Sequence, residues 1–297
     1  MTPYSWLEGH EYLRPVAELS AEVDRAVAAI EILETPVPDW DAYHADFLAG
    51  VPLLHSADAA IDLEPGGRIA AASIERLALA RSSGSLAAET RALHAELQRE
   101  PHAGRRIVDF LLGDDTVVSA FPGLMRYLGW TAMRRFIGPV VLAFDNWRNE
   151  ENEEKWQRRY CPTCGSLPAM AQLAGEEPAR RRLLSCGCCG TRWHFKRTCC
   201  PYCEADSQRL ESVVVEGESG LRIDHCAACS GYIKTYDGQG NESLFLSDWS
   251  SLHLDLLACD RGLKRLAASL YGFEHAPLLP PERCHSVGEA KRLQDLG

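Results

Sequence analysis

Cysteine is the residue type with the clearest chemistry in this chain. Four Cys-x-x-Cys pairs are separated by residues 165–185, 190–199 and 204–225, which are gaps of 21, 10 and 22 residues. Each such turn directs two sulfurs at one ion, and a hairpin that joins two turns gives a closed tetrahedral site. The nearly equal spans therefore predict two metal ions per chain, each held by four thiolates. The predicted ligands are Cys161, Cys164, Cys186 and Cys189 in the first site and Cys200, Cys203, Cys226 and Cys229 in the second.

The remaining cysteines lie outside these two sets. Cys188 and Cys199 each adjoin a predicted ligand, but only the chosen register keeps two residues between the partners of every pair. We interpret both as small packing residues, with ligand exchange or oxidation sensing as the alternative. Cys259 and Cys284 lie beyond the repeat and are interpreted as buried or incidental.

The residue after each Cys-x-x-Cys pair should have a special backbone conformation. Gly165 and Gly190 occupy this position in the first repeat, and glycine can adopt the positive φ that turns backbone N–H groups toward sulfur. The second repeat departs from this pattern, because Glu204 and Ser230 occupy the same positions.

Length and composition indicate a soluble globular protein with a sizeable core. The chain has 297 residues, of which 46% are hydrophobic and 25% charged, and two domains are expected. No signal peptide and no apolar run long enough to cross a bilayer is recognised, so we expect a cytoplasmic protein without membrane insertion. In a reducing compartment, twelve cysteines favour metal binding over disulfides. The formal net charge of −11 argues against general nucleic-acid binding.

The first half of the chain has the apolar spacing of α-helices. Apolar residues recur every three or four positions from Tyr12 to Ile30, and Pro36 and Pro38 are expected to end that helix. Further helices are expected over 40–51 with Asp39 as cap, 69–79, 86–97, 105–112, 117–128 and 130–147, the last kinked or split by Pro139. The pattern predicts a helical bundle over residues 1–154, and the acidic run 149–154 is interpreted as its boundary.

Strand-like alternation follows between and after the cysteine pairs, over 182–185, 210–215, 221–223 and 232–236. Asp248 is then expected to cap a helix that buries Leu252, Leu256 and Leu257, with a second short helix over 263–270. The predicted fold class is α+β. It consists of the helical domain 1–154, two tandem rubredoxin-like or zinc-ribbon modules over 155–199 and 200–245, and C-terminal helices with a tail over 246–297. Because hairpin ribbons have little core, loss of one ligand is expected to unfold its ribbon and to leave the helical half intact.

Charge divides the two modules. Residues 155–200 carry nine Lys or Arg against two Glu, whereas residues 201–245 carry three basic and eight acidic residues. The basic module could bind phosphate or an acidic peptide, for instance through Arg180–Arg182. The interpretation we favour is that its cations offset thiolate charge and solvate the surface.

The chain resembles the formate dehydrogenase accessory protein family, FdhE, over residues 160–273. The resemblance depends on five segments: Cys161–Ser166, Cys186–Arg197, Cys200–Cys203, Cys226–Lys234 and Asp248–Leu256. It implies a cytosolic protein that binds the catalytic subunit of respiratory formate dehydrogenase and assists its maturation before export by the twin-arginine route. It also implies rubredoxin-like sites that can hold iron. Four thiolates suit iron or zinc, so iron is favoured and zinc is the alternative.

Two function classes follow from these observations. The predicted function is a metal-binding accessory or chaperone protein, and the alternative is a zinc-ribbon module that binds nucleic acid, which the basic first module favours and the acidic second module opposes. A dithiol redox enzyme would need a Cys-x-x-Cys at a helix start in a βαβ setting, and no pair has that setting. We therefore predict that the protein is not an enzyme.

Overall fold

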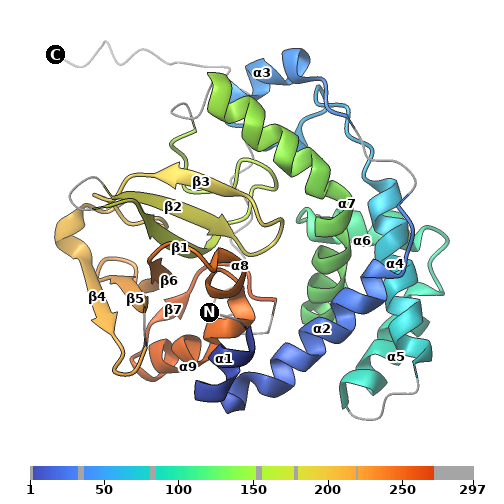
Figure 1. Ribbon diagram of the computed structural model, residues 1–297. Helices are drawn as coiled ribbons and strands as arrows, with labels where there is room; N and C mark the ends of the chain where they lie inside the picture. Colours follow the sequence, from blue (N-terminus) through green and yellow to red (C-terminus); the bar gives the residue numbers. More distant parts are fainter. Residues whose placement is uncertain are drawn as a thin grey trace, which may run out of the picture.

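Nine helices and one mixed sheet make up the described part of the chain, which comprises residues 3–32, 37–80, 85–151, 156–176, 180–218 and 220–270 of the computed structural model. The helices are α1 (Pro3–Gly9), α2 (Arg14–Ala28), α3 (Trp40–Ala49), α4 (Glu64–Leu79), α5 (Ser85–Leu97), α6 (Ala103–Leu111), α7 (Pro122–Glu151), α8 (Glu242–Phe245) and α9 (Leu252–Asp260). The strands are β1 (Pro168–Ala174), β2 (Arg181–Cys186), β3 (Arg192–Phe195), β4 (Leu210–Val214), β5 (Leu221–Cys226), β6 (Gly231–Asp237) and β7 (Lys264–Arg265). Within these ranges no helix is both long and apolar enough for a membrane span. The predicted α+β class is confirmed (Figure 1).

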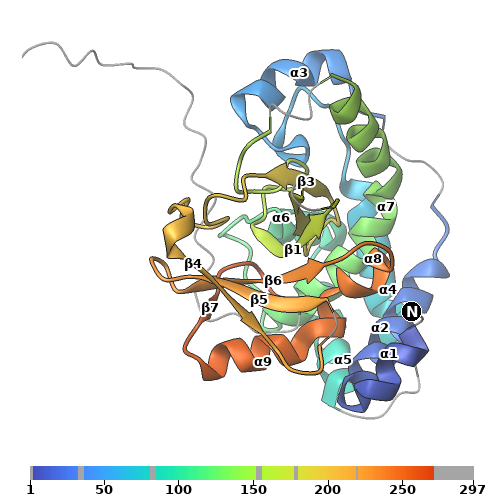
Figure 2. The same ribbon diagram turned by 60° about the vertical axis from the view of Figure 1, so that its left-hand side comes forward.

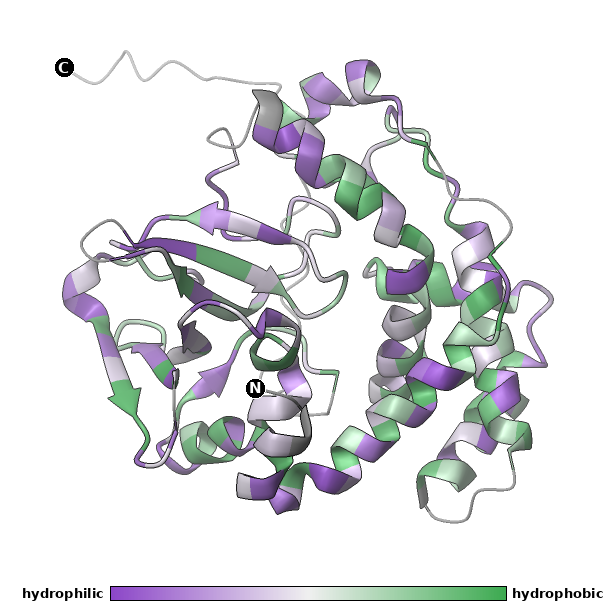
Figure 3. Cartoon of the chain, viewed as in Figure 1, coloured by the Kyte–Doolittle hydropathy of each residue, from purple (hydrophilic) through white to green (hydrophobic). Residues whose placement is uncertain are grey.

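The predicted helix 12–30 is present as α2, and polar and apolar residues mix along it as expected of a helix that packs by one face (Figure 3). It ends at Ala28, well before Pro38, so the expectation that prolines end it is wrong, and Pro36 lies outside the described residues. The physical reason is Arg135, whose guanidinium donates to the carbonyls of Val27 and Ile30 at 2.6 and 2.5 Å and satisfies the last turn.

Asp39 caps α3 as predicted, since its carboxylate accepts from the backbone N–H of Ala42 at 3.0 Å. Helices α4, α5 and α6 confirm three further predictions, although α4 begins at Glu64, several residues before the predicted start.

The two helices predicted over 117–128 and 130–147 are wrong, because the structure has the single helix α7 from Pro122 to Glu151. Pro122 stands at its first position, where the missing N–H costs no hydrogen bond. Gly129 does not break the helix but lets α6 approach, since a Cβ there would lie 3.1 Å from the Leu111 side chain. Pro139 lies inside α7 and does not split it, and Figure 1 shows that the helix bends.

One continuous sheet carries both cysteine repeats. Its strand order is β3-β2-β1-β6-β5-β4, and β7 pairs with β6 outside this path. Strands β1, β2 and β3 form one antiparallel unit and β4, β5 and β6 form the other. The units join where β1 runs parallel to β6, with Met170 opposite Lys234. The two modules are thus edge-to-edge neighbours in a single sheet, and the proposed bounds at 154/155, 199/200 and 245/246 remain predictions.

The central strands β1 and β6 are buried on both faces of the sheet, and successive side chains point to opposite faces. Ala171 and Ile233 point into a core shared with the helical bundle, whereas Met170 and Tyr232 point into a second core formed with α1, α8 and α9. Figures 1 and 2 show α9 and α1 on the side of the sheet away from α3 and α7. The sheet is therefore held between two groups of helices.

The C-terminal expectations need correction. Asp248 does not cap α9, because Ser251 precedes the helix and the Asp248 carboxylate binds Lys234 and Arg265 instead. Leu252 is buried as predicted, but Leu256 is 56% exposed. No helix covers 263–270, where the chain forms the short strand β7 and then runs without regular structure to residue 270.

Candidate metal centres

All four Cys-x-x-Cys turns have the same backbone construction. In each, the N–H of the residue after the second cysteine donates to the carbonyl of the first cysteine, at 2.8–3.2 Å. The four closing residues all have positive φ, and this includes the two that are not glycine. These closing residues are Gly165, Gly190, Glu204 and Ser230, with φ of 74°, 83°, 60° and 58°. The spacing alone therefore imposes the left-handed conformation, and the second repeat adopts it without glycine.

Backbone N–H groups also point at one sulfur in each turn. The amides of Thr163 and Cys188 lie 3.4 and 3.3 Å from the sulfurs of Cys161 and Cys186 in the first repeat. The amides of Tyr202 and Gly231 lie 3.4 Å from the sulfurs of Cys200 and Cys229 in the second. Such contacts spread the negative charge of a thiolate.

The predicted pairing of the eight cysteines matches their positions in space. Cys161, Cys164, Cys186 and Cys189 form one group, and Cys200, Cys203, Cys226 and Cys229 form another; within each group all sulfurs lie within 4.8 Å of one another. The shortest sulfur–sulfur distances are 3.4 Å in the first cluster and 3.8 Å in the second. A tetrahedral ion with bonds of about 2.3 Å separates its sulfurs by about 3.8 Å. Every cysteine in the described ranges is a free thiol, and each cluster could bind a metal ion.

Residues of the helical half form hydrogen bonds to the turns of the first cluster. Leu53 and Leu54, which follow α3, donate their backbone N–H groups to the carbonyls of Pro162 and Thr163 at 2.8 and 2.9 Å. The His55 ring lies 3.2 Å from the Cys164 carbonyl. On the other side, Arg134 of α7 donates to the carbonyls of Gly187 and Cys188. All four sulfurs of this cluster are buried as a result.

The second cluster lies nearer the surface. Cys203 is exposed and Cys229 half-buried, whereas Cys200 and Cys226 are buried. Its turns are bound by neighbouring segments of the sheet, since the N–H of Ala227 donates to Arg209 O and the N–H of Lys264 donates to Ser230 O, both at 2.8 Å. The two clusters therefore differ in solvent access although their backbones match.

Burial sets the proton affinity of the first cluster. It raises the pKa of the Cys161, Cys164 and Cys186 thiols well above their usual value. Burial also acts to raise the pKa of Cys189, but hydrogen bonds from the neighbouring thiols and from Thr191 outweigh it and hold that pKa well below its usual value. Metal binding replaces the remaining thiol protons, so it is coupled to proton release.

Burial acts less strongly on the thiols of the second cluster. It raises the pKa of Cys229 to about 11 and also raises that of Cys200. The pKa of Cys226 is lowered, because backbone N–H groups of Cys229 and Ala228 outweigh burial.

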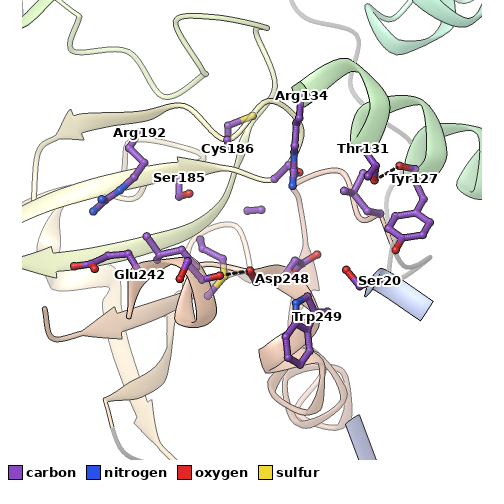
Figure 4. Close-up of a pocket in the computed structure, with 18 of the residues that line it drawn as sticks. Ser20, Tyr127, Thr131, Arg134, Ser185, Cys186, Arg192, Glu242, Asp248 and Trp249 are labelled. Atoms are coloured by element: carbon purple, nitrogen blue, oxygen red, sulfur yellow. Dashed lines mark hydrogen bonds between the residues drawn. The ribbon is translucent and has the colours of Figure 1, made fainter. Parts of the chain in front are cut away.

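A polar cavity of about 590 Å³ lies between α2, α7, the Cys186 turn and the segment that begins with α8. Figure 4 shows Arg134 and Arg192 on one side of it and Glu242 and Asp248 on the other. Cys186 is the one predicted ligand in its wall. The cavity brings solvent and both signs of charge to the edge of the first cluster.

Most arginines of the basic first module serve the fold itself. Buried Arg182 donates to the carbonyls of Lys196 and Cys199 at 3.1 and 2.8 Å, and Arg158 donates to Ala49 O at 2.9 Å. Further internal partners of this kind are Tyr202 O for Arg159, Asp237 for Arg180, Gln172 for Arg192 and Arg180 O for Arg197. Of Arg180–Arg182, the possible contacts to an acidic peptide, Arg182 is only 9% exposed and is occupied by these carbonyls.

Sequence reasoning missed a buried ion network next to the second repeat. Lys234 on β6 contacts Asp248 and Asp255, and Arg265 on β7 contacts the same two carboxylates. Tyr232 donates its hydroxyl to Asp255 at 2.6 Å. A signal was available, because charged residues stand within the otherwise apolar segments 231–236 and 252–258.

Known proteins with similar sequences carry one family name. The family model described as "FdhE, central domain" matches residues 160–197. The Protein FdhE homolog of Aquifex aeolicus is 29% identical over 142 residues, 46% of this chain and 50% of that protein. The homolog of Stutzerimonas stutzeri is 30% identical over 152 residues, 47% of this chain and 48% of that protein. These matches span about half the length of the curated relatives.

A solved structure extends the likeness to most of the fold. The crystal structure of the FdhE protein from Pseudomonas aeruginosa matches with a TM-score of 0.56 and 24% identity, over 88% of each chain. The family model contains the four predicted ligands of the first repeat, Cys161, Cys164, Cys186 and Cys189. The chain is thus similar to proteins named FdhE in the sequence of its first cysteine repeat and in its fold.

Proposed function

We propose that this protein is a metal-binding accessory protein, or chaperone, for the maturation of respiratory formate dehydrogenase. In this proposal it binds the catalytic subunit in the cytosol, before that subunit is exported. The observation that carries the proposal is the pair of four-cysteine clusters on one sheet in a chain whose residues 160–197 match the FdhE central-domain model. Four sulfurs close each site and leave no coordination position for a substrate, which supports a binding protein over an enzyme.

Iron is the metal we propose for both clusters, with zinc as the alternative. Backbone N–H groups approach sulfurs of both clusters, and such hydrogen bonds tune the reduction potential of an iron–thiolate centre. They also fit a structural zinc site, so the metal must be measured.

Metal analysis tests this part of the proposal. Protein purified without oxygen should contain two ions per chain, and with iron it should show the visible charge-transfer absorption of ferric thiolates after oxidation. Cys164→Ser and Cys226→Ser should each remove one ion. Two zinc ions and no visible absorption would identify the metal as zinc and not iron. Fewer than two ions in the wild type would contradict the site assignment.

Binding to nucleic acid is disfavoured by the use of the arginines. Phosphate binding requires a contiguous basic surface, and six arginines of the basic module donate to acceptors within the protein itself. Arg181 and Lys196 are exposed but stand in a chain of net charge −11. The charge supports a protein partner over DNA or RNA.

Affinity capture from a native extract tests the partner. The metal-loaded protein should capture the catalytic subunit of formate dehydrogenase, identified by mass spectrometry. Cys226→Ser, which lacks the second ion, serves as the matched comparison for the more exposed cluster. In parallel, titration with duplex DNA over a salt series should give no specific complex. Salt-dependent DNA binding that Arg181→Ala weakens, together with no capture of the enzyme, would overturn the proposal in favour of the nucleic-acid module.

A further inference from the structure

A third group of metal-binding side chains lies away from both cysteine clusters. His10 follows α1, Glu218 lies in the turn between β4 and β5, and His253 is in the first turn of α9. Their ligand atoms all lie within 4.8 Å of one another. The Oε1 atom of Glu218 is 2.9 Å from Nε2 of His10 and 2.7 Å from Nε2 of His253. Three segments that are remote in sequence thus bring two imidazoles to one carboxylate.

The orientation of His10 shows which nitrogen faces the group. Its Nδ1 lies 2.9 Å from the carbonyl of Trp6, an acceptor, so Nδ1 carries the proton. Nε2 is hydrogen-bonded to Oε1 of Glu218 at 2.9 Å, which requires a proton on Nε2 when no ion is bound; an ion would replace that proton and bind the lone pair of the neutral ring. The ring is also stacked on Trp6, with 3.8 Å between the ring centroids, which fixes its direction. A histidine that donates one N–H to a carbonyl and offers the other nitrogen is the usual arrangement of a metal ligand.

Two polar atoms of the group lack hydrogen-bond partners. Oε2 of Glu218 and Nδ1 of His253 are buried without one, whereas Nε2 of His253 lies 2.7 Å from Oε1 of Glu218. The side chains of His10, Glu218 and His253 are only 12%, 6% and 11% exposed. Buried polar groups in folded proteins nearly always have a hydrogen-bond partner, so two unsatisfied atoms at one place indicate a missing one. A cation satisfies a carboxylate and two imidazole lone pairs at once.

We propose that His10, Glu218 and His253 bind a third metal ion, a divalent transition ion such as zinc, through two nitrogens and one oxygen. This donor set differs from the thiolate clusters and suits zinc or ferrous iron. Three protein ligands leave a fourth position for water. Tetrahedral bonds of about 2.0–2.1 Å place ligand atoms about 3.3 Å apart, so the contacts from Glu218 have to open by roughly half an ångström.

The ion would fasten the start of the chain to the sheet and its last helix. Figure 1 shows α1 next to α9, and both cores on this side combine the two elements, since Trp6 packs with Leu254 and Leu7 with Leu252. A bond from His10 through the ion to Glu218 and His253 would add a covalent-like connection between these segments.

Titration of the full-length protein with both cysteine clusters loaded tests the proposal. Cobalt(II) and zinc are the probes, because cobalt at a nitrogen and oxygen site gives weak d–d bands without sulfur charge transfer. The wild type should bind one further equivalent, which His10→Gln and His253→Gln should abolish. His102→Gln removes an exposed histidine without a side-chain cap bond and should retain it.

Two outcomes would overturn the third site. One is a wild type that binds no ion beyond those of the cysteine clusters, a result that needs no variant. The other is a further equivalent that survives in the double variant of His10 and His253. Helical circular dichroism and the metal content of the cysteine clusters report whether each variant is folded, so loss of the site is distinguished from loss of the fold.

Discussion

Lys234 and Asp255 form an ion pair in which neither side chain is exposed, with 2.7 Å between Nζ and Oδ2. Asp248 and Arg265 complete the network, so two cations balance two carboxylates in a closed environment. The pair connects β6 to α9, two segments on which the resemblance to the FdhE family depends. Breaking such a network leaves an unpaired buried charge, which costs more than the intact network contributes.

Lys234→Met is therefore expected to lower the free energy of unfolding by about 3–5 kcal/mol. The methionine fills similar volume, but Asp248 and Asp255 then share one cation, Arg265. Urea unfolding followed by circular dichroism measures the change. Arg68→Ala, which removes the exposed Arg68–Glu64 pair, is the control and should change stability by less than about 1 kcal/mol. Equal losses in the two variants would contradict this account of the network.

The buried carboxyl of Asp248 should make the stability of the protein depend on pH. Burial acts to raise its pKa, but Arg265 and then Lys234 outweigh burial and hold that pKa well below the usual 3.8. A carboxyl with a depressed folded pKa stabilises the protein above its unfolded pKa, and this stabilisation is lost as the pH falls through the folded value. The wild type should thus lose stability below about pH 4.

Asp248→Asn tests the assignment to this carboxyl. The variant is less stable at neutral pH, and its difference from the wild type should shrink as the pH is lowered from about 6 to about 3. Release of metal at acid pH affects both proteins, so the difference between them isolates the carboxyl. Parallel curves over this range would assign the acid sensitivity to other groups.

The sequence predicted the local part of the candidate sites well. Cys-x-x-Cys spacing fixes each turn within five residues, so the partition of the eight cysteines and the special position of Gly165 and Gly190 could be inferred. What failed depended on distant contacts. Asp248 has the residue type of a helix cap, and only the approach of Lys234 and Arg265 gives it another role.

The same limit explains the errors in the helices and the sheet. Gly129 and Pro139 are of residue types that often interrupt a helix, but packing against α6 keeps α7 continuous through Gly129. The parallel pairing of β1 with β6 joins the two repeats, and no periodicity within either repeat indicates it. Arg182 was expected on the surface because charge is usually solvated. Its guanidinium instead donates to the carbonyls of Lys196 and Cys199 at the end of its own module.

Cys161→Ser is now expected to affect more than its own ribbon. The sulfur cluster belongs to the same core as Trp130, Phe144 and Trp156, and Leu53 and Leu54 bind its first turn. Loss of the first ion should therefore lower the free energy of unfolding, as followed by the helical circular dichroism signal, by about 3–5 kcal/mol. Cys203→Ser, at an exposed position of the second cluster, should remove one ion but change the helical signal less. An unchanged helical transition in Cys161→Ser would support the earlier expectation that the halves are independent.

Chelation should distinguish the two clusters in the wild type. Cys203 is exposed and Cys229 half-buried, whereas all four cysteines of the first cluster are buried beneath the segment that follows α3 and Arg134 of α7. A chelator should remove one equivalent quickly from the second cluster and the other slowly. Cys226→Ser should abolish the fast phase and keep the slow one. A single phase, or loss of the slow phase in this variant, would contradict the difference in access.

The backbone conformations of two glycines predict opposite effects on stability when each is replaced by alanine. Gly190 has φ of +83° and no atom within 4 Å of an added Cβ, so Gly190→Ala incurs backbone strain alone, about 1–2 kcal/mol. Gly138 lies inside α7, also has open space around an added Cβ, and lacks positive φ. Gly138→Ala should therefore stabilise the protein by up to about 1 kcal/mol, the helix propensity of alanine over glycine. Urea unfolding of the two metal-loaded variants should give changes of opposite sign. If Gly190→Ala were neutral, the left-handed closure of that turn would not be required for the fold.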